Sequence, residues 1–402
     1  MAEMQVALYS DFSFHSGDPF EEDCPMKFTL LRRLYLVLLI PAIAVGLNAA
    51  DPIDEIDIGL IIEPTASHIS GYLEVLATRK GIRSVAVTAP DKGTLENAKR
   101  QLGNRFQGNG FTNAKQMLAR VHPDLTIVTL EGAHAPAAIR AALEANSHVL
   151  TEKPSCTKLE QFEQLARLAQ NRQLHLMLAM ATRSGAALKK ARQLVASDVI
   201  GKPYSVSMVW IADQKRLTTK AYHTSWLADP KRAGGGKLIY HGIHYLDVIQ
   251  HLLNDPIREI NGFTQNVGGQ PIHVEDSAVV SFRFASGATG THNTGYYLDR
   301  GKQSEIRIWG SHGWLRLAHL EGEPLKWHST QPGAPQGIQQ FKYADTREMY
   351  HLFFQDAIDA IRKGTPPPIT TSESLRALRV VFAAYEAVAT GRTQQVKISN
   401  AR

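Results

Sequence analysis

Short β-rich runs alternate with amphipathic helical stretches between residues 57 and 180, and this rhythm constrains the fold more than any other feature of the chain. The apolar runs 58–62, 84–88 and 125–130 are rich in β-branched residues, and segments whose apolar residues recur at helical spacing separate them. Strands that are joined through helices form right-handed crossovers and therefore a parallel sheet. Ligands bind to such a sheet beyond the carboxyl ends of its strands.

The pattern changes after residue 180. The β-rich segments 278–284 and 305–317 are bounded by turns rather than by helices, which is typical of an antiparallel sheet. The chain has 402 residues, of which 44% are hydrophobic, and this is enough for more than one core. The sequence therefore predicts an α/β protein with a parallel-sheet domain over residues 51–180 and a second domain, with an antiparallel sheet, over residues 181–396.

The N-terminal region has the features of an export signal. In residues 26–50, Lys and Arg precede the apolar run 34–47, and small residues follow it. This run is shorter than the roughly 20 residues that a membrane-spanning helix needs, so we expect no stable membrane span. We therefore expect Met26 to be the physiological start and residues 1–25 to be a disordered extension or a misassigned start. The mature protein would then be exported to the periplasm or the extracellular space, beginning near Asp51; the alternative is a buried apolar helix.

Charge and cysteine content exclude several classes of function. The formal net charge is +6, but the chain has no long run of Lys or Arg and no basic stripe interleaved with aromatic residues. We therefore expect no nucleic-acid partner, and an anionic small ligand explains the charge more simply. The only cysteines, Cys24 and Cys156, cannot form a disulfide framework or a zinc site built from thiolates.

Two motifs carry groups that can do chemistry. The sequence Glu-Lys-Pro at 152–154 follows the apolar end of a predicted strand, so Lys153 lies where a parallel sheet binds its ligand rather than at a random surface position. Three glycines at 234–236 precede a helical run, in which Tyr240 and His244 lie one turn apart.

A metal site on this helix is the first alternative. His241 and His244 are neighbours at i and i+3, but no acidic residue accompanies them as in known zinc motifs, and we predict no metal. Taken alone, His244 could equally be a core histidine that bonds to the backbone.

The motifs together resemble the glucose-fructose oxidoreductase/inositol dehydrogenase (Gfo/Idh/MocA) family. The likeness rests on "EKP", on "GGG" followed by "GIH", on "VEDSAVVSFRFASGATGT" and on the closing "SESLRALRVVFAAYEAVATGR", and it extends from about Ile58 to Val396. It implies a Rossmann-type domain for NAD(P), followed by an α+β domain whose large, open, mostly antiparallel sheet supports substrate binding and often oligomerisation. It also implies hydride transfer at a carbinol carbon of a sugar or polyol.

The resemblance assigns roles to individual residues. Lys153 matches the lysine beside the nicotinamide and the reacting oxygen, His244 matches the acid/base, and Arg183 matches a basic position of the substrate pocket. Removal of the hydroxyl proton eases hydride loss, and histidine titrates near neutral pH. A nearby ammonium would stabilise the developing alkoxide. The further substrate-contacting candidates are His223, Trp226 and His241. The cofactor-binding candidates are Glu63, Thr65, Ala66, Ser67, Leu130, Glu152 and Lys153.

The chain departs from the family pattern at two places. Tyr240 replaces an aspartate that usually precedes the histidine, so we expect it to be an auxiliary donor. The loop 62–67 lacks all three glycines of G-x-G-x-x-G; Pro64 has no N–H, and Glu63 would repel a phosphate that it faced. The hydroxyls and the helix N-terminus remain. Asp91 could bind the ribose or simply belong to a turn, and no arginine follows the second strand, which favours NAD over NADP.

These observations favour an exported NAD(P)-dependent oxidoreductase that acts on a sugar or polyol and self-associates through the sheet of its second domain. One alternative is a glycosidase of the same fold, which regenerates its bound NAD in each cycle. The other is a carbohydrate-binding descendant that has lost catalysis and the dinucleotide.

Overall fold

The computed structural model describes residues 54–318, 322–343 and 348–398. The predicted extension and signal peptide, residues 1–50, lie outside these ranges. No helix within the described ranges is long and apolar enough to cross a membrane.

The first sheet has five parallel strands in the order β2-β1-β3-β4-β5. Its strands are β1 (Ile56–Ile62), β2 (Ile82–Thr88), β3 (Leu125–Thr129), β4 (His148–Thr151) and β5 (Leu176–Leu178). The connecting helices are α1 (Ile69–Thr78), α2 (Lys92–Leu102), α3 (Ala114–Val121), α4 (Ala135–Glu144) and α5 (Leu159–Asn171). The strands are almost completely buried because helices cover both faces, as their continuous apolar runs predict.

The strand order reverses beside β1. The chain passes from β1 to β2 on one side and reaches β3 on the other side. The loops after β1 and β3 therefore diverge at the carboxyl end of the sheet, which is the position where open α/β sheets bind ligands.

The second sheet has nine strands in the order β13-β12-β11-β10-β6-β9-β8-β7-β14. Neighbouring strands are antiparallel except for β6 and β9, which are parallel. Its strands are β6 (Pro203–Asp213), β7 (Ile257–Gln265), β8 (Ser277–Phe284), β9 (Thr289–Leu298), β10 (Lys302–Gly310), β11 (Gly313–Leu317), β12 (Leu325–Ser329), β13 (Gln339–Phe341) and β14 (Gln394–Gln395). The predicted fold class is thus confirmed.

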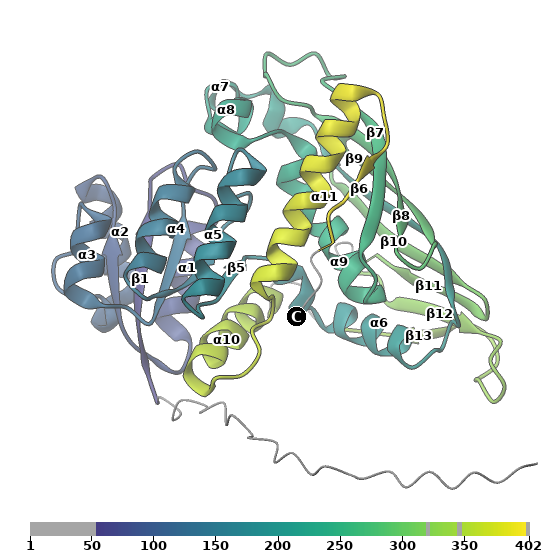
Figure 1. Cartoon of the computed structure of the whole chain (residues 1–402), viewed down its shortest axis with the longest axis horizontal. Coiled ribbons are helices and arrows are strands. Elements are labelled where there is room, and N and C mark those ends of the chain that lie inside the picture. The colour runs from purple at the N-terminus through teal and green to yellow at the C-terminus, as the bar shows by residue number, and fades with distance from the viewer. Residues whose placement is uncertain (1–53, 319–321, 344–347, 399–402) are drawn as a thin grey trace, which may run out of the picture. The chain divides into compact units, whose positions relative to one another are not determined.

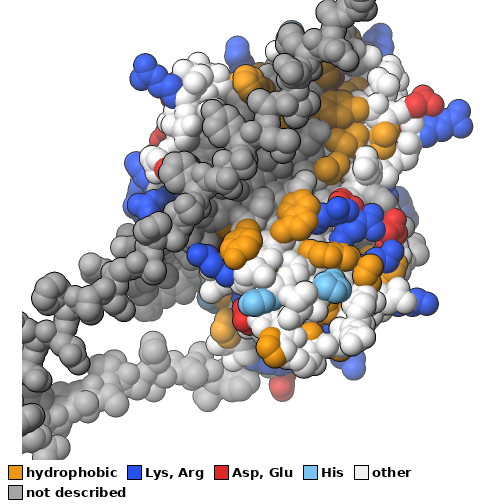
Figure 2. Space-filling model, turned by 90° about the vertical axis from the view of Figure 1, so that its right-hand side faces the viewer, with side chains coloured by type: hydrophobic (Ala, Val, Ile, Leu, Met, Phe, Trp, Pro, Cys, Tyr) orange, Lys and Arg blue, Asp and Glu red, His pale blue; other side chains and the backbone are white. Residues whose placement is uncertain are grey.

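One face of the second sheet is covered and the other is open. In β8, buried residues alternate strictly with more exposed ones. Figure 2 shows the side of the molecule on which this sheet lies, with hydrophobic side chains scattered among polar ones. Phe263 and Val279, which pair across β7 and β8, are 82% and 44% exposed. The open face therefore carries exposed apolar side chains among the exposed polar residues of its strands.

The remaining helices belong to the second half of the chain. They are α6 (Ala186–Ala196), α7 (Lys220–His223), α8 (Pro230–Ala233), α9 (Ile243–Leu253), α10 (Glu348–Lys363) and α11 (Thr371–Thr390). Helix α11 packs against α5 and β5 and also against α9 and β7 (Figure 1). Thr371 and Ser374 at its start accept hydrogen bonds from the backbone N–H groups of Leu176 and Leu178, at 2.9 and 3.1 Å. These bonds satisfy two N–H groups at the edge of the parallel sheet and attach α11, which also packs on β7, to that sheet.

Candidate active site

Lys153 follows β4 and reaches the segment that precedes α9. Its Nζ donates a hydrogen bond to the carbonyl oxygen of Tyr240 at 2.9 Å and lies 3.6 Å from the centre of the Tyr240 ring. The residue is only 4% exposed. The ammonium from the first sheet is therefore fixed against the helical segment that carries Tyr240 and His244.

The glycines before this helix allow a tight approach to Glu275. A Cβ added to Gly236 would lie 2.1 Å from the backbone carbonyl oxygen of Glu275, so only glycine fits. The Glu275 carboxylate accepts the N–H groups of Gly236 and Leu238 at 2.8 and 3.0 Å, and also the hydroxyl of Tyr385 at 2.8 Å. This carboxylate caps the start of the helix and satisfies N–H groups that would otherwise lack partners.

The first turn of the helix is wider than the sequence predicts. Residues Leu238–Gly242 are π-helical, and the N–H of Ile243 reaches back five residues to Leu238. A simple α-helical spacing therefore does not describe the relation of Tyr240 to His244. Such single π-turns frequently occur at functional sites.

Tyr240 lies between several polar groups. Its hydroxyl is 3.3 Å from the hydroxyl of Ser67 in the β1–α1 loop, and the guanidinium of Arg216 lies 5.5 Å from its ring. Burial alone would raise the pKa of the Tyr240 phenol, but Lys153, the hydrogen bond with Ser67 and the charge of Arg216 outweigh it and lower that pKa. The phenol can thus exchange a proton more readily than an ordinary tyrosine.

His241 lies next to these cations. The His241 ring stacks on Trp210 at 5.4 Å, and its Nδ1 is 3.3 Å from the Tyr296 hydroxyl. Desolvation lowers the pKa of His241 well below its ordinary range, and the charges of its neighbours, which include Lys153 and His244, lower it further. The charges of Lys153 and His244 therefore both lower the pKa of the His241 imidazole, although these two residues come from different halves of the chain.

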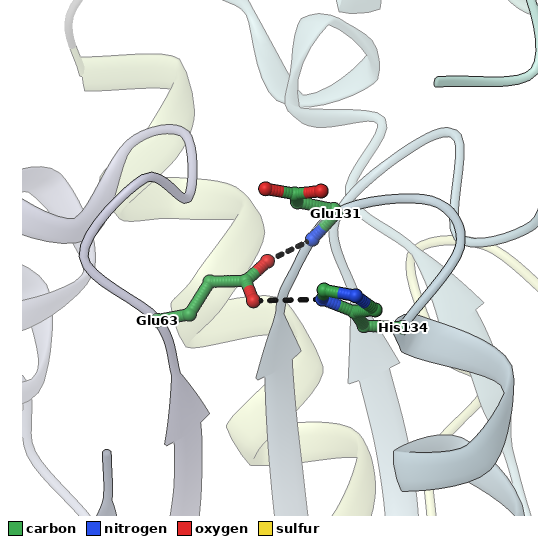
Figure 3. Close-up of side chains that lie close together, drawn as sticks. All are labelled: Glu63, Glu131 and His134. Carbon is green, nitrogen blue, oxygen red and sulfur yellow. Dashed lines mark hydrogen bonds and ion pairs between the residues drawn. The ribbon is translucent and has the colours of Figure 1, made fainter. Parts of the chain in front are cut away.

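Glu63, whose carboxylate would repel a phosphate, is hydrogen-bonded to the residues that follow β3 (Figure 3). Its carboxylate accepts the backbone N–H of Glu131 and lies 2.9 Å from His134 Nδ1. The Glu131 carboxylate in turn pairs with Arg232 and accepts the hydroxyl of Thr65 at 3.1 Å. These pairings direct Glu63 toward the β3–α4 loop.

A cavity of about 530 Å³ lies at the start of α1. It is lined by Pro64, Ala66, His68, Ile69, Ser70, Gly71, Asp91, Gly93, Thr94 and Asn97. Asp91 caps α2 by accepting the N–H of Thr94 at 2.9 Å, so the turn interpretation of this residue holds while its carboxyl also borders the cavity. A Cβ added to Gly71 would meet no atom within 4 Å.

Three of the predicted substrate residues make structural contacts. Arg183 is 4% exposed and forms a two-pronged ion pair with Asp247 and a third bond with Glu373, which indicates a role in joining helices rather than in binding a ligand. His223 Nε2 lies 2.6 Å from the carbonyl oxygen of Leu217. Trp226 is 3% exposed, so it offers no stacking face.

The other predicted cofactor residues also lie near this end of the sheet. Glu152 accepts the hydroxyl of Tyr72 at 2.8 Å, and Leu130 packs against the core. Sequence reasoning missed Arg216, Trp210, Tyr296 and Lys237, which surround His241 and Tyr240. Only Lys237 left a signal, because it is a charged residue in an otherwise apolar run.

Comparison with known proteins decides the family. A model described as "Oxidoreductase family, NAD-binding Rossmann fold" matches residues 65–180, and one described as "GFO/IDH/MocA C-terminal domain" matches residues 188–316. Together they cover more than half of the chain. The chain belongs to the Gfo/Idh/MocA family. It is therefore an oxidoreductase, and the predicted NAD(P) cofactor is confirmed at the level of the family.

Relatives of this Gfo/Idh/MocA oxidoreductase include proteins named as dehydrogenases of a glucoside and of an inositol. It is 25% identical over 347 residues to D-glucoside 3-dehydrogenase of Escherichia coli, which covers 81% of this chain and 92% of that protein. It is 22% identical over 260 residues to myo-inositol 2-dehydrogenase of Thermotoga maritima, covering 64% and 75%. Levoglucosan dehydrogenase in complex with NADH and levoglucosan superposes with a TM-score of 0.76 at 17% identity, covering 86% of this chain and 100% of that one.

The residues of this Gfo/Idh/MocA oxidoreductase fit a dinucleotide despite the absent glycines. The α1 N-terminus borders an open cavity, and its first N–H groups are the kind of donors that bind a phosphate. Glu63 is turned toward Glu131 and His134. Thr65, Ala66 and Ser67 would therefore lie against the bound cofactor without a repelling carboxylate in the loop.

Trp226 supports this loop, which leads to a testable prediction. Its Nε1–H donates a hydrogen bond to the carbonyl oxygen of Thr65 at 3.0 Å. Trp226→Phe removes this bond, worth about 1 kcal/mol, so we expect the Kd for NADH to rise by about threefold to tenfold while kcat at saturation stays within about twofold. Fluorescence titration would measure the Kd, with Trp309→Phe on the distant sheet as the matched control. An unchanged Kd would show that Trp226 does not position the loop.

Proposed function

We propose that this oxidoreductase transfers a hydride between NAD(P) and a carbinol carbon of a sugar or polyol. The observation that carries the proposal is the contact of the Lys153 ammonium with Tyr240, at the start of the helix that bears His244. The hydroxyl of Tyr240 also meets Ser67 in the dinucleotide loop. The names of the relatives, which include dehydrogenases of a glucoside and of an inositol, support this substrate class.

Each residue has a defined task in this reaction. The nicotinamide of the bound cofactor supplies the hydride acceptor. His244 accepts the proton of the substrate hydroxyl, and Lys153 stabilises the negative charge that develops on the oxygen. Tyr240 positions Lys153, because both its carbonyl oxygen and its ring contact Nζ.

Two assays on the purified protein test the proposal. Mass spectrometry of the denatured protein, after reconstitution with excess NAD(H), should detect bound dinucleotide. The loaded protein should then produce a stoichiometric absorbance change at 340 nm with one or more members of a panel of sugars and polyols. Release of a free sugar from a glycoside without that change would indicate a glycosidase, and complete failure to bind dinucleotide would indicate a binding protein.

NAD is the better candidate of the two cofactors. The residues that line the cavity beside α1 include Asp91 but no arginine or lysine, so nothing among them would neutralise a 2′-phosphate. The same titration performed with NADPH should give a weaker affinity than with NADH.

We also propose export of the protein, on the evidence of the signal-like segment 26–50. N-terminal sequencing of the protein secreted by its natural host should begin near Asp51. A mature chain that retains residue 1 would contradict this proposal.

We also propose that the protein self-associates through the open face of the nine-stranded sheet. The face exposes Phe263, Val279 and Trp309, and a second copy of the sheet would cover these apolar groups while its serines and threonines pair with their counterparts. Light scattering should give the mass of an oligomer, and Phe263→Glu should shift it to the monomer. A monomeric wild-type protein would refute the proposal.

A further inference from the structure

Lys237 is a buried lysine that directly follows the three glycines. It is 1% exposed, and among the described residues its Nζ makes no hydrogen bond. Nζ instead lies 4.1 Å from the ring centre of Tyr296 on β9 and 5.3 Å from that of Trp210 on β6. Lys237 therefore extends from the glycine segment toward the covered face of the second sheet, beside His241.

The surroundings of Lys237 are positively charged. Burial, together with the charges of Arg216 and Lys153, lowers the pKa of Lys237 to about 6. Arg216 itself forms no ion pair with any carboxylate in the described ranges, and the groups beside it are the phenols of Tyr222, Tyr240 and Tyr296. Three basic side chains thus converge on one region.

The nearby carboxylates, Glu275 and Asp276, form hydrogen bonds with other groups. Glu275 accepts two backbone N–H groups and the Tyr385 hydroxyl. Asp276 accepts the N–H groups of Val267 and Gly268 at 2.8 Å each. Neither carboxylate is paired with Lys237, so no carboxylate within the described ranges serves as its counter-ion.

Packing alone does not explain a lysine at this position. An apolar side chain of the same length would fill the space against Trp210 and Tyr296 without the cost of a buried amine that lacks a partner. The aromatic rings compensate an ammonium only in part. The arrangement is therefore suited to a ligand that brings a negative charge.

We propose that Lys237 and Arg216 receive an anionic substituent of the substrate, so that the enzyme acts on acidic sugars, which carry a carboxylate or a phosphate. The proposal rests on the proposed oxidoreductase function, because it places the anion beside Lys237 and the reacting hydroxyl beside Lys153 and His244. Lys237 is three residues from Tyr240 along the helix, and both Lys153 and Arg216 act on the Tyr240 phenol. One sugar ring could therefore meet both groups of residues.

Binding of an anion should be accompanied by the uptake of a proton. At pH 7 most of Lys237 is neutral before binding, and a bound anion would favour its ammonium form. We expect the uptake of about one proton for each acidic sugar bound, and none for a neutral sugar.

Calorimetry on the NAD-loaded protein tests this inference. Glucuronic acid would be compared with glucose, galacturonic acid with galactose, and glucose 6-phosphate with glucose, each in two buffers of different ionisation enthalpy at pH 7. At least one acid should bind about 10- to 100-fold more tightly than its neutral partner and take up a proton, as expected for a charged hydrogen bond. Lys237→Met should abolish both the preference and the proton uptake.

Controls separate this inference from the proposed function. Lys231→Met removes an exposed lysine on α8 and should change neither quantity, whereas Arg216→Gln, a partly exposed position, should weaken the preference even if Lys237→Met does not fold. The inference is overturned if no acid binds more tightly than its neutral partner, or if folded Lys237→Met keeps the preference. Oxidation of neutral sugars would then still support the oxidoreductase. Tight binding of acids with proton uptake, but without any change at 340 nm, would support the anion site and refute the proposed reaction.

Discussion

Replacing Lys153 with methionine should lower kcat about a thousandfold while the protein stays folded. The ammonium is the group that can stabilise the alkoxide at the moment of hydride transfer, and loss of one such donor typically costs a factor of 10²–10³. Its position is fixed by the Tyr240 carbonyl oxygen at 2.9 Å and by the ring beneath it. Initial rates at 340 nm with saturating NAD would measure the effect.

The matched control is Lys115→Met on the exposed surface of α3, which should leave kcat unchanged. Circular dichroism and thermal unfolding would establish that both variants fold, and NADH titration would establish that Lys153→Met still binds the dinucleotide. If folded, NADH-binding Lys153→Met kept the wild-type kcat, Lys153 would have no part in the chemistry.

His244→Asn should lower kcat by about 10²–10⁴-fold, because it removes the group that takes the proton from the substrate hydroxyl. Initial rates at 340 nm with saturating NAD would measure this loss.

Tyr240→Phe is the informative partner of His244→Asn. It keeps the backbone carbonyl oxygen and the ring that hold Lys153 and removes only the hydroxyl next to Ser67. We expect a loss of about tenfold or less, and His312→Asn in an exposed turn should have no effect. A larger loss in Tyr240→Phe than in His244→Asn would move the proton transfer to the phenol, whose pKa the nearby cations lower.

The fold was predictable because its signals are local. The apolar runs of β1, β2 and β3 are continuous in sequence, and the segments between them have helical spacing, so a parallel sheet followed directly. Helix α3, residues 114–121, was not predicted, and the parallel pairing of β6 with β9 has no sequence signal, since it depends on how distant strands meet.

The site was predictable only where a motif marks it. The position of Lys153 follows from the end of a strand, but the contact with Tyr240 joins residues 87 positions apart. The same limit applies to Glu63 and Arg183. The Glu63 carboxylate accepts the backbone N–H of Glu131, and Arg183 forms an ion pair with Asp247. Long-range partners decide whether a charged residue faces a ligand, and a single sequence does not reveal them.

The most direct test of the central claim follows the hydride itself. The sugar that gives the largest signal at 340 nm would be prepared with deuterium on its carbinol carbons and mixed with NAD-loaded protein. Mass spectrometry should find one deuterium in the NADH formed by the wild-type protein and almost no deuterated NADH with Lys153→Met. Reduced cofactor without deuterium, or equal deuterium transfer by the two proteins, would contradict the account.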